Sequence, residues 1–307
     1  MKIFIPTRII PTQKNINAVN IIMFSIIKEL IKRKHKIILL PILYINRDKK
    51  DSSFTNDNIR KLKNMGVIIL PLQKLKIVDE KRNIIKRIFF PKNSDFFPVI
   101  NLKKNISLLI NKISPDLILT IWDEVSTDLI CEINYKKCCY YGDPPPLNYN
   151  EILKQKLNSK NYFEKLLAKM VFFFYKKNYL KFHLSNISKI EYLFNISKLH
   201  TNYYIKNKIN CKYVNNIFQN TYSLEKIKNY KRKKNKVFKI IGNVGNLAGT
   251  ANNLGIRYLL EKVLPELKKK KILFEVHLFG SGTLSEINQK LSKRFNEVKI
   301  RGFVKNL

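Results

Sequence analysis

The sequence predicts an α/β protein with two Rossmann-like domains, and three observations lead to that prediction. Short, continuous apolar segments alternate with amphipathic ones along the whole chain. Glycine-rich turns follow two of the apolar segments, as they do where a parallel strand leads into a helix. A polar, basic segment separates two series of such units. Because continuous apolar strands belong to parallel sheets covered on both faces, both series are expected to be doubly wound.

The first series starts at the N-terminus. Residues 2–5 and 36–40 are predicted strands, and residues 17–32 between them have the broad apolar face of a helix packed on a sheet. Gly66 ends a helical pattern, and further strands are predicted where apolar runs follow turn signals. These further strands are 67–70, Leu117–Ile121 and Lys137–Tyr141.

The second series follows a basic stretch that ends in four consecutive cations, 231–234. We therefore predict an N-terminal domain over 1–220, a linker over 221–236 and a C-terminal domain over 237–307. The elements expected in that second domain are strands at 237–241, Phe274–Phe279 and 298–304, and helices at 254–269 and 284–295. So few strands would leave a sheet edge exposed and the core small, so we expect this domain to be truncated in the sequence.

The charge of the chain is strongly positive, at +37 from 59 Lys and Arg against 22 Asp and Glu in 307 residues. Most of the excess is lysine, spread evenly and accompanied by many Ile and Asn, which is typical of a biased composition. Charge alone speaks to non-specific association, and no nucleic-acid-binding module is recognisable. We therefore expect no specific nucleic-acid partner, and retain contact with anionic lipid, nucleotide phosphates or an acidic glycan.

The four cysteines form neither a metal pattern nor a disulfide framework. Cys138 and Cys139 are adjacent in a predicted strand, Cys131 lies on a predicted helix, and Cys211 is far away in the sequence. This usage favours a reduced, cytoplasmic compartment and no metal site. Pro6 and Arg8 interrupt the N-terminal apolar run, and no apolar stretch reaches the roughly 20 residues that a spanning helix needs.

Two strand-to-helix junctions carry the clearest chemical signal. The first is IIGNVGNLAGTANNLG at 240–255, with Gly245 and Gly249 at its centre, and the second is FGSGTL at 279–284, with Gly280 and Gly282. Glycines let a ligand approach the backbone, and amides at a helix N-terminus attract phosphate. The spacing matches neither the dinucleotide fingerprint nor the P-loop. The glycines of the first junction could also serve only to shape a long loop.

Several motifs resemble GT-B glycosyltransferases in order and spacing. They are MKIFIP at 1–6, LIKRKHKI at 30–37, SPDLI at 114–118, VGNL at 244–247, LGIRYLL at 254–260, VHLFGSGTL at 276–284 and RGFV at 301–304. Within that group the chain most resembles the large, mostly retaining bacterial family, glycosyl transferases group 1 or family 4, which builds envelope and capsule glycans. The resemblance covers the whole chain, and the C-terminal motifs are its most specific part.

The resemblance implies a nucleotide-diphosphate sugar as donor, no separate bound cofactor, and a glycan or lipid-linked acceptor held by the N-terminal domain. Residues 245–250 would face the donor diphosphate, Gly280 and Gly282 would lie beneath the nucleoside, and 302–304 beside the base. The implied donor-binding residues are Gly245, Asn246, Gly249, Thr250, Arg257, Gly280, Gly282 and Val304.

The chain departs from the family pattern at two phosphate-facing positions. Many members have Arg and Lys where this sequence has Asn246 and Leu254. Arg257, or backbone amides with the helix dipole, would then have to bind the diphosphate. A non-catalytic protein of the same fold, which binds a sugar nucleotide or a partner, is the alternative to an enzyme.

A catalytic group is harder to identify. Asp143 follows a strand in YYGDPPP at 140–146, where its carboxylate would orient an acceptor hydroxyl or act as a base, or else cap the turn. Trp122 would either face a sugar or pack in the core, and core packing is the favoured prediction. His35 and His183 are expected to be structural.

The segment 162–182 is both apolar and basic, and two interpretations of it stay open. In one it lies peripherally on an anionic membrane at the inner face, and in the other it is a core helix of the N-terminal domain.

Overall fold

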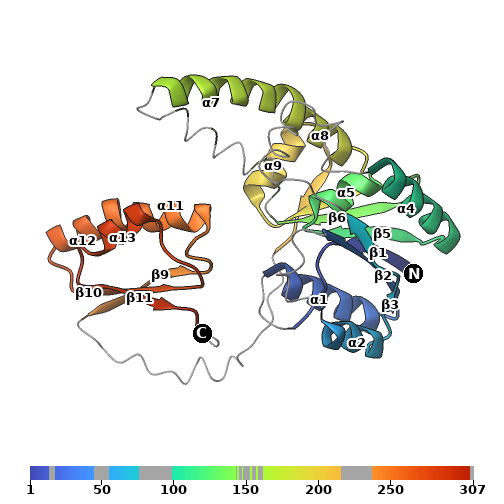
Figure 1. The fold of residues 1–307 in the computed structure, drawn as a ribbon, viewed down its shortest axis with the longest axis horizontal. Helices are drawn as coiled ribbons and strands as arrows, with labels where there is room; N and C mark the ends of the chain where they lie inside the picture. The colour runs from blue at the N-terminus through green and yellow to red at the C-terminus, as the bar shows by residue number, and fades with distance from the viewer. Residues whose placement is uncertain are drawn as a thin grey trace. The chain divides into compact units, whose positions relative to one another are not determined.

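The computed structural model describes residues 1–13, 18–44, 55–75, 99–142, 144, 147, 153, 157, 162–215 and 237–304. Contacts divide the chain into two compact units, unit 1 over Met1–Asn220 and unit 2 over Thr221–Leu307 (Figure 1). The predicted linker at 221–236 lies outside the described residues.

Unit 1 is built on a parallel sheet with the strand order β3-β2-β1-β5-β6-β7-β8, and β4 pairs in addition with β2. The chain order runs outward from β1 to β3, then returns to the other side of β1 with β5, which creates a topological switch point between β1 and β5. The strands are β1 (Lys2–Thr7), β2 (Lys36–Tyr44), β3 (Ile68–Ile69), β4 (Gln73–Leu75), β5 (Leu117–Ile121), β6 (Lys137–Tyr141), β7 (Tyr192–Asn195) and β8 (Cys211–Tyr213).

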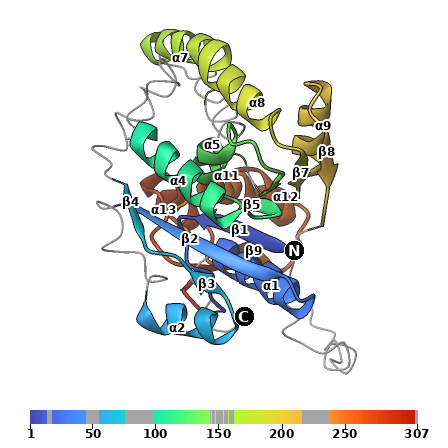
Figure 2. The same cartoon turned by 90° about the vertical axis from the view of Figure 1, so that its right-hand side faces the viewer.

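Helices cover both faces of this sheet, as Figure 2 shows. Alternate residues of β1 enter two separate cores: Ile3 and Ile5 pack toward α1 (Ala18–Lys32) and α2 (Asn56–Asn64), while Phe4 packs toward α4 (Val99–Ile113) and α5 (Glu124–Ile130). Because side chains alternate across a strand, a strand buried on both faces must be apolar throughout. The near-continuous apolar runs in the sequence follow from this double burial.

A third core lies at the β8 end of the sheet. Here α8 (Lys181–Ile187) and α9 (Lys198–Lys206) pack on β6, β7 and β8 through buried side chains that include Tyr141, Ile187 and Tyr204. Helix α8 continues a longer helical segment that begins with α7 (Tyr162–Phe174) and passes through one π-helical stretch, η3 (Tyr175–Leu180). None of the described helices is long and apolar enough to cross a membrane.

Unit 2 contains a parallel three-stranded sheet in the order β11-β10-β9. Its strands are β9 (Phe238–Val244), β10 (Phe274–Phe279) and β11 (Val298–Gly302), and its helical segments are α11 (Thr250–Tyr258), η4 (Leu259–Val263), α12 (Leu264–Lys269) and α13 (Glu286–Ser292). In the described part of unit 2 the helices all lie on one face of the sheet (Figure 1), over Phe274, Val276 and Leu278 of β10.

The predicted fold class, α/β with two Rossmann-like domains, is confirmed. Strands β5, β6 and β10 have the predicted bounds. The prediction was wrong about the start of the helix expected at 254–269, because α11 begins at Thr250, where a Thr-Ala-Asn-Asn run hides the helical period. The helix expected at 284–295 is shortened to α13, since Ser285 caps it. Cys131 is the residue that ends α5 rather than part of it.

Candidate functional site

The two predicted junctions lie side by side at one edge of the unit 2 sheet. Since β9, β10 and β11 are parallel, all three end at the same edge. Backbone bonds join the loops that follow them: Gly245 N donates to Phe279 O over 3.1 Å, and Leu247 N donates to Ser281 O over 2.7 Å. Gly280 N donates in turn to Gly302 O over 2.8 Å. One continuous backbone surface therefore forms the carboxyl edge of the sheet.

Glycine is required where these loops touch. Gly280 has φ +151°, and a Cβ added there would lie 1.5 Å from the carbonyl oxygen of Gly245, a separation that no side chain tolerates. Gly282 has φ +80°, and its added Cβ would lie 2.9 Å from Asn246 Oδ1. Packing between the two loops thus explains why glycine occupies these two positions. These glycines also keep side chains off the edge of the sheet.

Gly249 stands directly before α11 and leaves that helix without a side-chain cap. It has extended backbone, with φ −66° and ψ 135°, and makes no side-chain hydrogen bond to the helix. The first bond of the helical ladder runs from Asn253 N to Gly249 O, at 2.9 Å. The amides of residues 250–252 precede that ladder and point along the helix axis at its positive end. This geometry suits an anionic group such as a phosphate.

A set of asparagine side chains holds the first loop in shape. Asn246 Oδ1 accepts from Ala248 N over 3.0 Å, and Asn252 Nδ2 donates to Asn246 O over 2.8 Å. Asn253 Nδ2 donates to Leu247 O over 2.7 Å, and its Oδ1 accepts from Ser285 N over 3.0 Å. The two junctions are therefore tied together by side chains as well as by backbone. Sequence analysis had no signal for this, since asparagines are common throughout the chain.

Not all predicted donor-binding residues come together at this edge. Gly245, Asn246, Gly249, Gly280 and Gly282 do, and Thr250 begins α11 just beside them. Arg257 lies in the last turn of α11, where its Nε contacts Glu261 Oε1 at 2.9 Å. Seven residues of helix separate it from Thr250, which is about 10 Å along the axis. Val304 follows β11, two residues beyond Gly302.

The sheet face opposite the helices carries a charged cluster that sequence analysis missed. Glu275 contacts Lys299 and also lies 3.1 Å from His277 Nε2, while Arg301 Nε donates to His277 Nδ1 over 2.9 Å. The hydrogen bond from Lys299, and then that from His277, lowers the pKa of Glu275 to about 2. Phe274, Val276 and Leu278 enter the core, and the residues between them face the other side of the sheet. The alternation in FEVHLF, 274–279, was therefore the sequence signal for this charged face.

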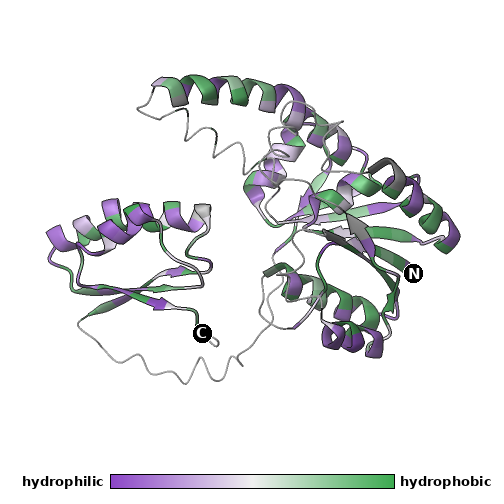
Figure 3. Ribbon diagram, viewed as in Figure 1, coloured by the Kyte–Doolittle hydropathy of each residue, from purple (hydrophilic) through white to green (hydrophobic). Residues whose placement is uncertain are grey.

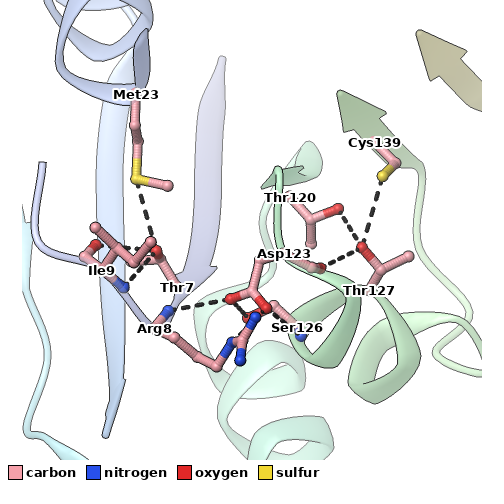
Figure 4. Close-up of polar contacts among 9 residues, drawn as sticks. All are labelled: Thr7, Arg8, Ile9, Met23, Thr120, Asp123, Ser126, Thr127 and Cys139. Atoms are coloured by element: carbon pink, nitrogen blue, oxygen red, sulfur yellow. Dashed lines mark hydrogen bonds and ion pairs between the residues drawn. The ribbon is translucent and has the colours of Figure 1, made fainter. Parts of the chain in front are cut away.

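Unit 1 has its own strand-to-helix junction, at the switch point between β1 and β5 (Figure 4). Arg8 follows β1 and Asp123 follows β5, and Arg8 Nε lies 2.6 Å from Asp123 Oδ1 while Arg8 N donates to Asp123 Oδ2 over 3.1 Å. The Asp123 side chain is 4% exposed and that of Arg8 23%. Asp123 also caps α5, accepting from Ser126 N over 3.3 Å and from Ser126 Oγ over 2.6 Å.

Trp122 immediately precedes this cap and has a left-handed backbone, with φ +50°. Its ring packs over Gly142, where an added Cβ would lie 2.4 Å from the indole, and joins the core beneath α1. The expected packing role of Trp122 is therefore confirmed. The candidate catalytic residue Asp143 is the next residue after Gly142 and lies outside the described residues.

His183 and Cys139 are buried in unit 1, and His35 contacts the N-terminal amine. His183 Nε2 bonds Tyr204 Oη at 2.9 Å in the core, and His35 Nδ1 lies 3.3 Å from the N-terminal amine. Burial raises the pKa of Cys139 to about 12, so that thiol is protonated near neutral pH. No group of three or more His, Cys, Asp or Glu residues in the described segments is placed to hold a metal ion.

The geometry thus defines a class, a two-unit Rossmann-like protein with an open, glycine-lined sheet edge in unit 2. No protein-family model and no curated protein matches the chain. Solved structures that align with it include a glycosyltransferase from Rickettsia africae ESF-5, at 14% identity, with 99% of this chain and 68% of that chain covered and a TM-score of 0.49.

Two other solved structures also align with nearly the full length of this chain. A mutant of S. aureus TarM, in complex with fondaparinux, α-GlcNAc-glycerol and UDP, is 11% identical, with 99% of this chain and 78% of that chain covered and a TM-score of 0.49. A UDP-GlcNAc 2-epimerase from Neisseria meningitidis, bound to UDP-GlcNAc, is 13% identical, with 98% and 72% covered and a TM-score of 0.40. What the chain does must be inferred from its own residues.

Proposed function

We propose that the protein is a glycosyltransferase that moves a sugar from a nucleotide-diphosphate donor to a glycan or lipid-linked acceptor in cell-surface polysaccharide synthesis. In this proposal unit 2 binds the donor and unit 1 the acceptor. Asp143 is retained as the candidate acceptor-side base. The donor is a substrate, and no separate cofactor is required. The protein would act in the cytoplasm, at the inner face of the membrane.

The observation that carries the proposal is the N-terminus of α11 at a glycine-lined sheet edge. A nucleotide diphosphate needs a stretch of backbone that it can approach closely, together with donors for its phosphate oxygens. The loop 245–249 offers the first, and the amides of 250–252 offer the second. The ordered motifs VGNL, LGIRYLL, VHLFGSGTL and RGFV, which resemble those of GT-B donor domains, lie on these same elements.

A donor held in this way would be bound by backbone more than by side-chain cations. Asn246 uses its side chain within the loop, Leu254 is exposed on α11, and Arg257 pairs with Glu261. Transfer needs stabilisation of the departing diphosphate, which backbone amides and a helix dipole supply in a fixed orientation. The α11 terminus would therefore serve both binding and leaving-group departure.

The same three residues favour the second candidate, a sugar-nucleotide-binding protein without transferase activity. A site that lacks side-chain cations can hold a diphosphate and yet stabilise its departure poorly. The two candidates share the donor site and differ in turnover. Binding without release of the nucleoside diphosphate, across a panel of acceptors, would favour the binding protein.

Calorimetric titration with a panel of sugar nucleotides tests the donor site. Gly249→Val keeps the backbone conformation allowed, but its branched side chain would stand at the entrance to α11. We expect it to weaken donor binding at least tenfold. Gly255→Ala, on the same helix with open space around the new methyl group, is the matched control and should leave affinity unchanged. Unchanged affinity in the Gly249 variant would rule out this placement.

A further inference from the structure

Helix α7 presents an apolar stripe to solvent. Its exposed large apolar residues recur every three or four positions and so share one face of the helix. Phe163 is 72% exposed, Leu166 54% and Phe173 59%. Figure 3 shows apolar residues along the length of this helix. The exposed residues of the stripe are Tyr162, Phe163, Leu166, Leu167, Met170 and Phe173.

The opposite face of the same helical segment is shielded from solvent, and Tyr179 Oη on that face donates to Glu124 Oε1 over 2.7 Å. Ala168 in α7, with Tyr175 and Tyr179 in η3, is buried. These positions lie about half a helical turn from Leu166 and Phe173. Among the described residues, both faces of the segment are therefore apolar, and the stripe is the face that is exposed.

The charges near the stripe are mostly positive. Between residues 162 and 187 the sequence contains lysines at 165, 169, 176, 177 and 181, and a single acidic residue, Glu164. Lys165 and Lys169 lie along one flank of the stripe by helical position, and both are exposed. Lys176 Nζ lies 4.5 Å from the ring centroid of Phe172, and Lys177 Nζ lies 5.7 Å from that of Phe173. Cations are thus held against aromatic rings at the border of the stripe.

We propose that α7 docks on an anionic membrane surface, with the apolar stripe at the acyl boundary and the lysines on lipid headgroup phosphates. Exposed aromatic and aliphatic side chains flanked by lysine are the pattern of helices that lie in the interface plane. With 13 residues, α7 is about 20 Å long, which suits lying on the surface. A net charge of +37 draws the whole chain toward an anionic surface.

This inference rests on the proposed function in one respect, since a lipid-linked acceptor would lie in that membrane. Docking itself is measured without nucleotide, so the two can fail separately. Vesicle binding without donor binding would leave α7 as the membrane contact and remove the transferase. Donor binding without vesicle binding would support the donor site and overturn the membrane contact of α7.

Co-sedimentation with vesicles of phosphatidylcholine alone, or with phosphatidylglycerol added, tests the docking. The wild type should bind the anionic vesicles and bind neutral ones at least tenfold more weakly at moderate salt. Leu166→Asp should weaken binding to anionic vesicles at least fivefold. Its matched control is Leu108→Asp on α4, where a mid-helix leucine is 59% exposed, and this variant should change binding less than twofold.

Circular dichroism first establishes that both variants are folded, and Leu166→Gln replaces Leu166→Asp if that variant is not. Equal binding to neutral and anionic vesicles would overturn the proposal, as would equal losses in the two variants. Analytical ultracentrifugation tests the alternative that the apolar stripe of α7 contacts a second copy of the chain. A concentration-dependent dimer that Leu166→Asp dissociates, with no preference for anionic vesicles, would also overturn it.

Discussion

The strand-to-helix junctions after β5 and after β9 each follow the carboxyl end of a parallel strand, and they are built in opposite ways. In unit 1, Asp123 caps α5 with its carboxylate and pairs with Arg8 from the neighbouring strand end. In unit 2, Gly249 precedes α11 and no side chain caps that helix. The amides at the start of both helices favour negative charge. Unit 1 satisfies them with its own carboxylate, whereas the N-cap residue of α11 supplies no side-chain acceptor.

Three other helices in the described part of the chain have a side-chain cap. Thr55 caps α2, Ser197 caps α9 and Ser285 caps α13, each by accepting a hydrogen bond from a backbone amide three residues on. The chain therefore does supply capping side chains at other helix N-termini. Leaving α11 with glycine therefore has a reason other than composition, and access to the helix N-terminus is the reason we propose.

The largest effect is expected where the two loops of unit 2 touch. Gly280→Ala would place a methyl group against the Gly245 carbonyl and force a residue other than glycine to φ +151°. We expect unit 2 to lose about 3 kcal/mol or more of stability. Hydrogen exchange of β10 amides measures this. The fluorescence of Trp122, the sole tryptophan, follows unit 1 and should change little, because the two units have separate cores.

The cap in unit 1 is the next test. Asp123→Ala removes a helix cap and a buried partner of Arg8, and the partly exposed guanidinium can recover water, so we expect a loss of about 2–3 kcal/mol. Urea unfolding followed by Trp122 fluorescence measures it. Asp57→Ala is the control, since its ion pairs with Arg60 and Lys61 are exposed and should contribute about 0.5 kcal/mol or less. Equal losses would mean that the Asp123 junction has no special role.

A smaller effect of opposite sign is expected within α11. Gly255 lies inside that helix with nothing within 4 Å of an added Cβ. Gly255→Ala should therefore stabilise unit 2 by about 0.5–1 kcal/mol, through helix propensity and a less flexible unfolded chain. The exchange of β10 amides is again the measurement. A loss of stability would contradict this explanation of Gly255.

Helices and strands were predictable where turn or capping residues mark their ends. Contacts between residues that are far apart in the sequence were not predictable. Pro115 and Asp116 precede β5, and its apolar run ends at Trp122, so both bounds were visible. Strands β7 and β8, of four and three residues, were not predicted. The glycine turns were found from sequence. Their packing on one another was not, because it joins residues 35 positions apart.

The Arg8–Asp123 pair is a second contact that could not be predicted from the sequence. Its two residues are 115 positions apart, and nothing in either segment marks the other as a partner. Only the strand order, with β5 beside β1, brings them together. Arg257 was proposed only as a substitute for the cations that Asn246 and Leu254 replace. Its place in the last turn of α11 could not be predicted, because the start of that helix was predicted wrongly.

The most direct test of the central claim introduces into unit 2 the kind of carboxylate cap that Asp123 provides in unit 1. Gly249→Asp would place a carboxylate cap on α11, and Gly249→Asn a neutral cap of nearly the same shape. Calorimetric titration with a UDP-sugar, a GDP-sugar and an ADP-sugar then separates charge from bulk. We predict that the preferred donor binds the Asn variant several-fold more weakly than the wild type, and the Asp variant at least a further tenfold more weakly because two anions compete for one helix terminus. Equal affinity of the wild type and the Asp variant for that donor would contradict the account.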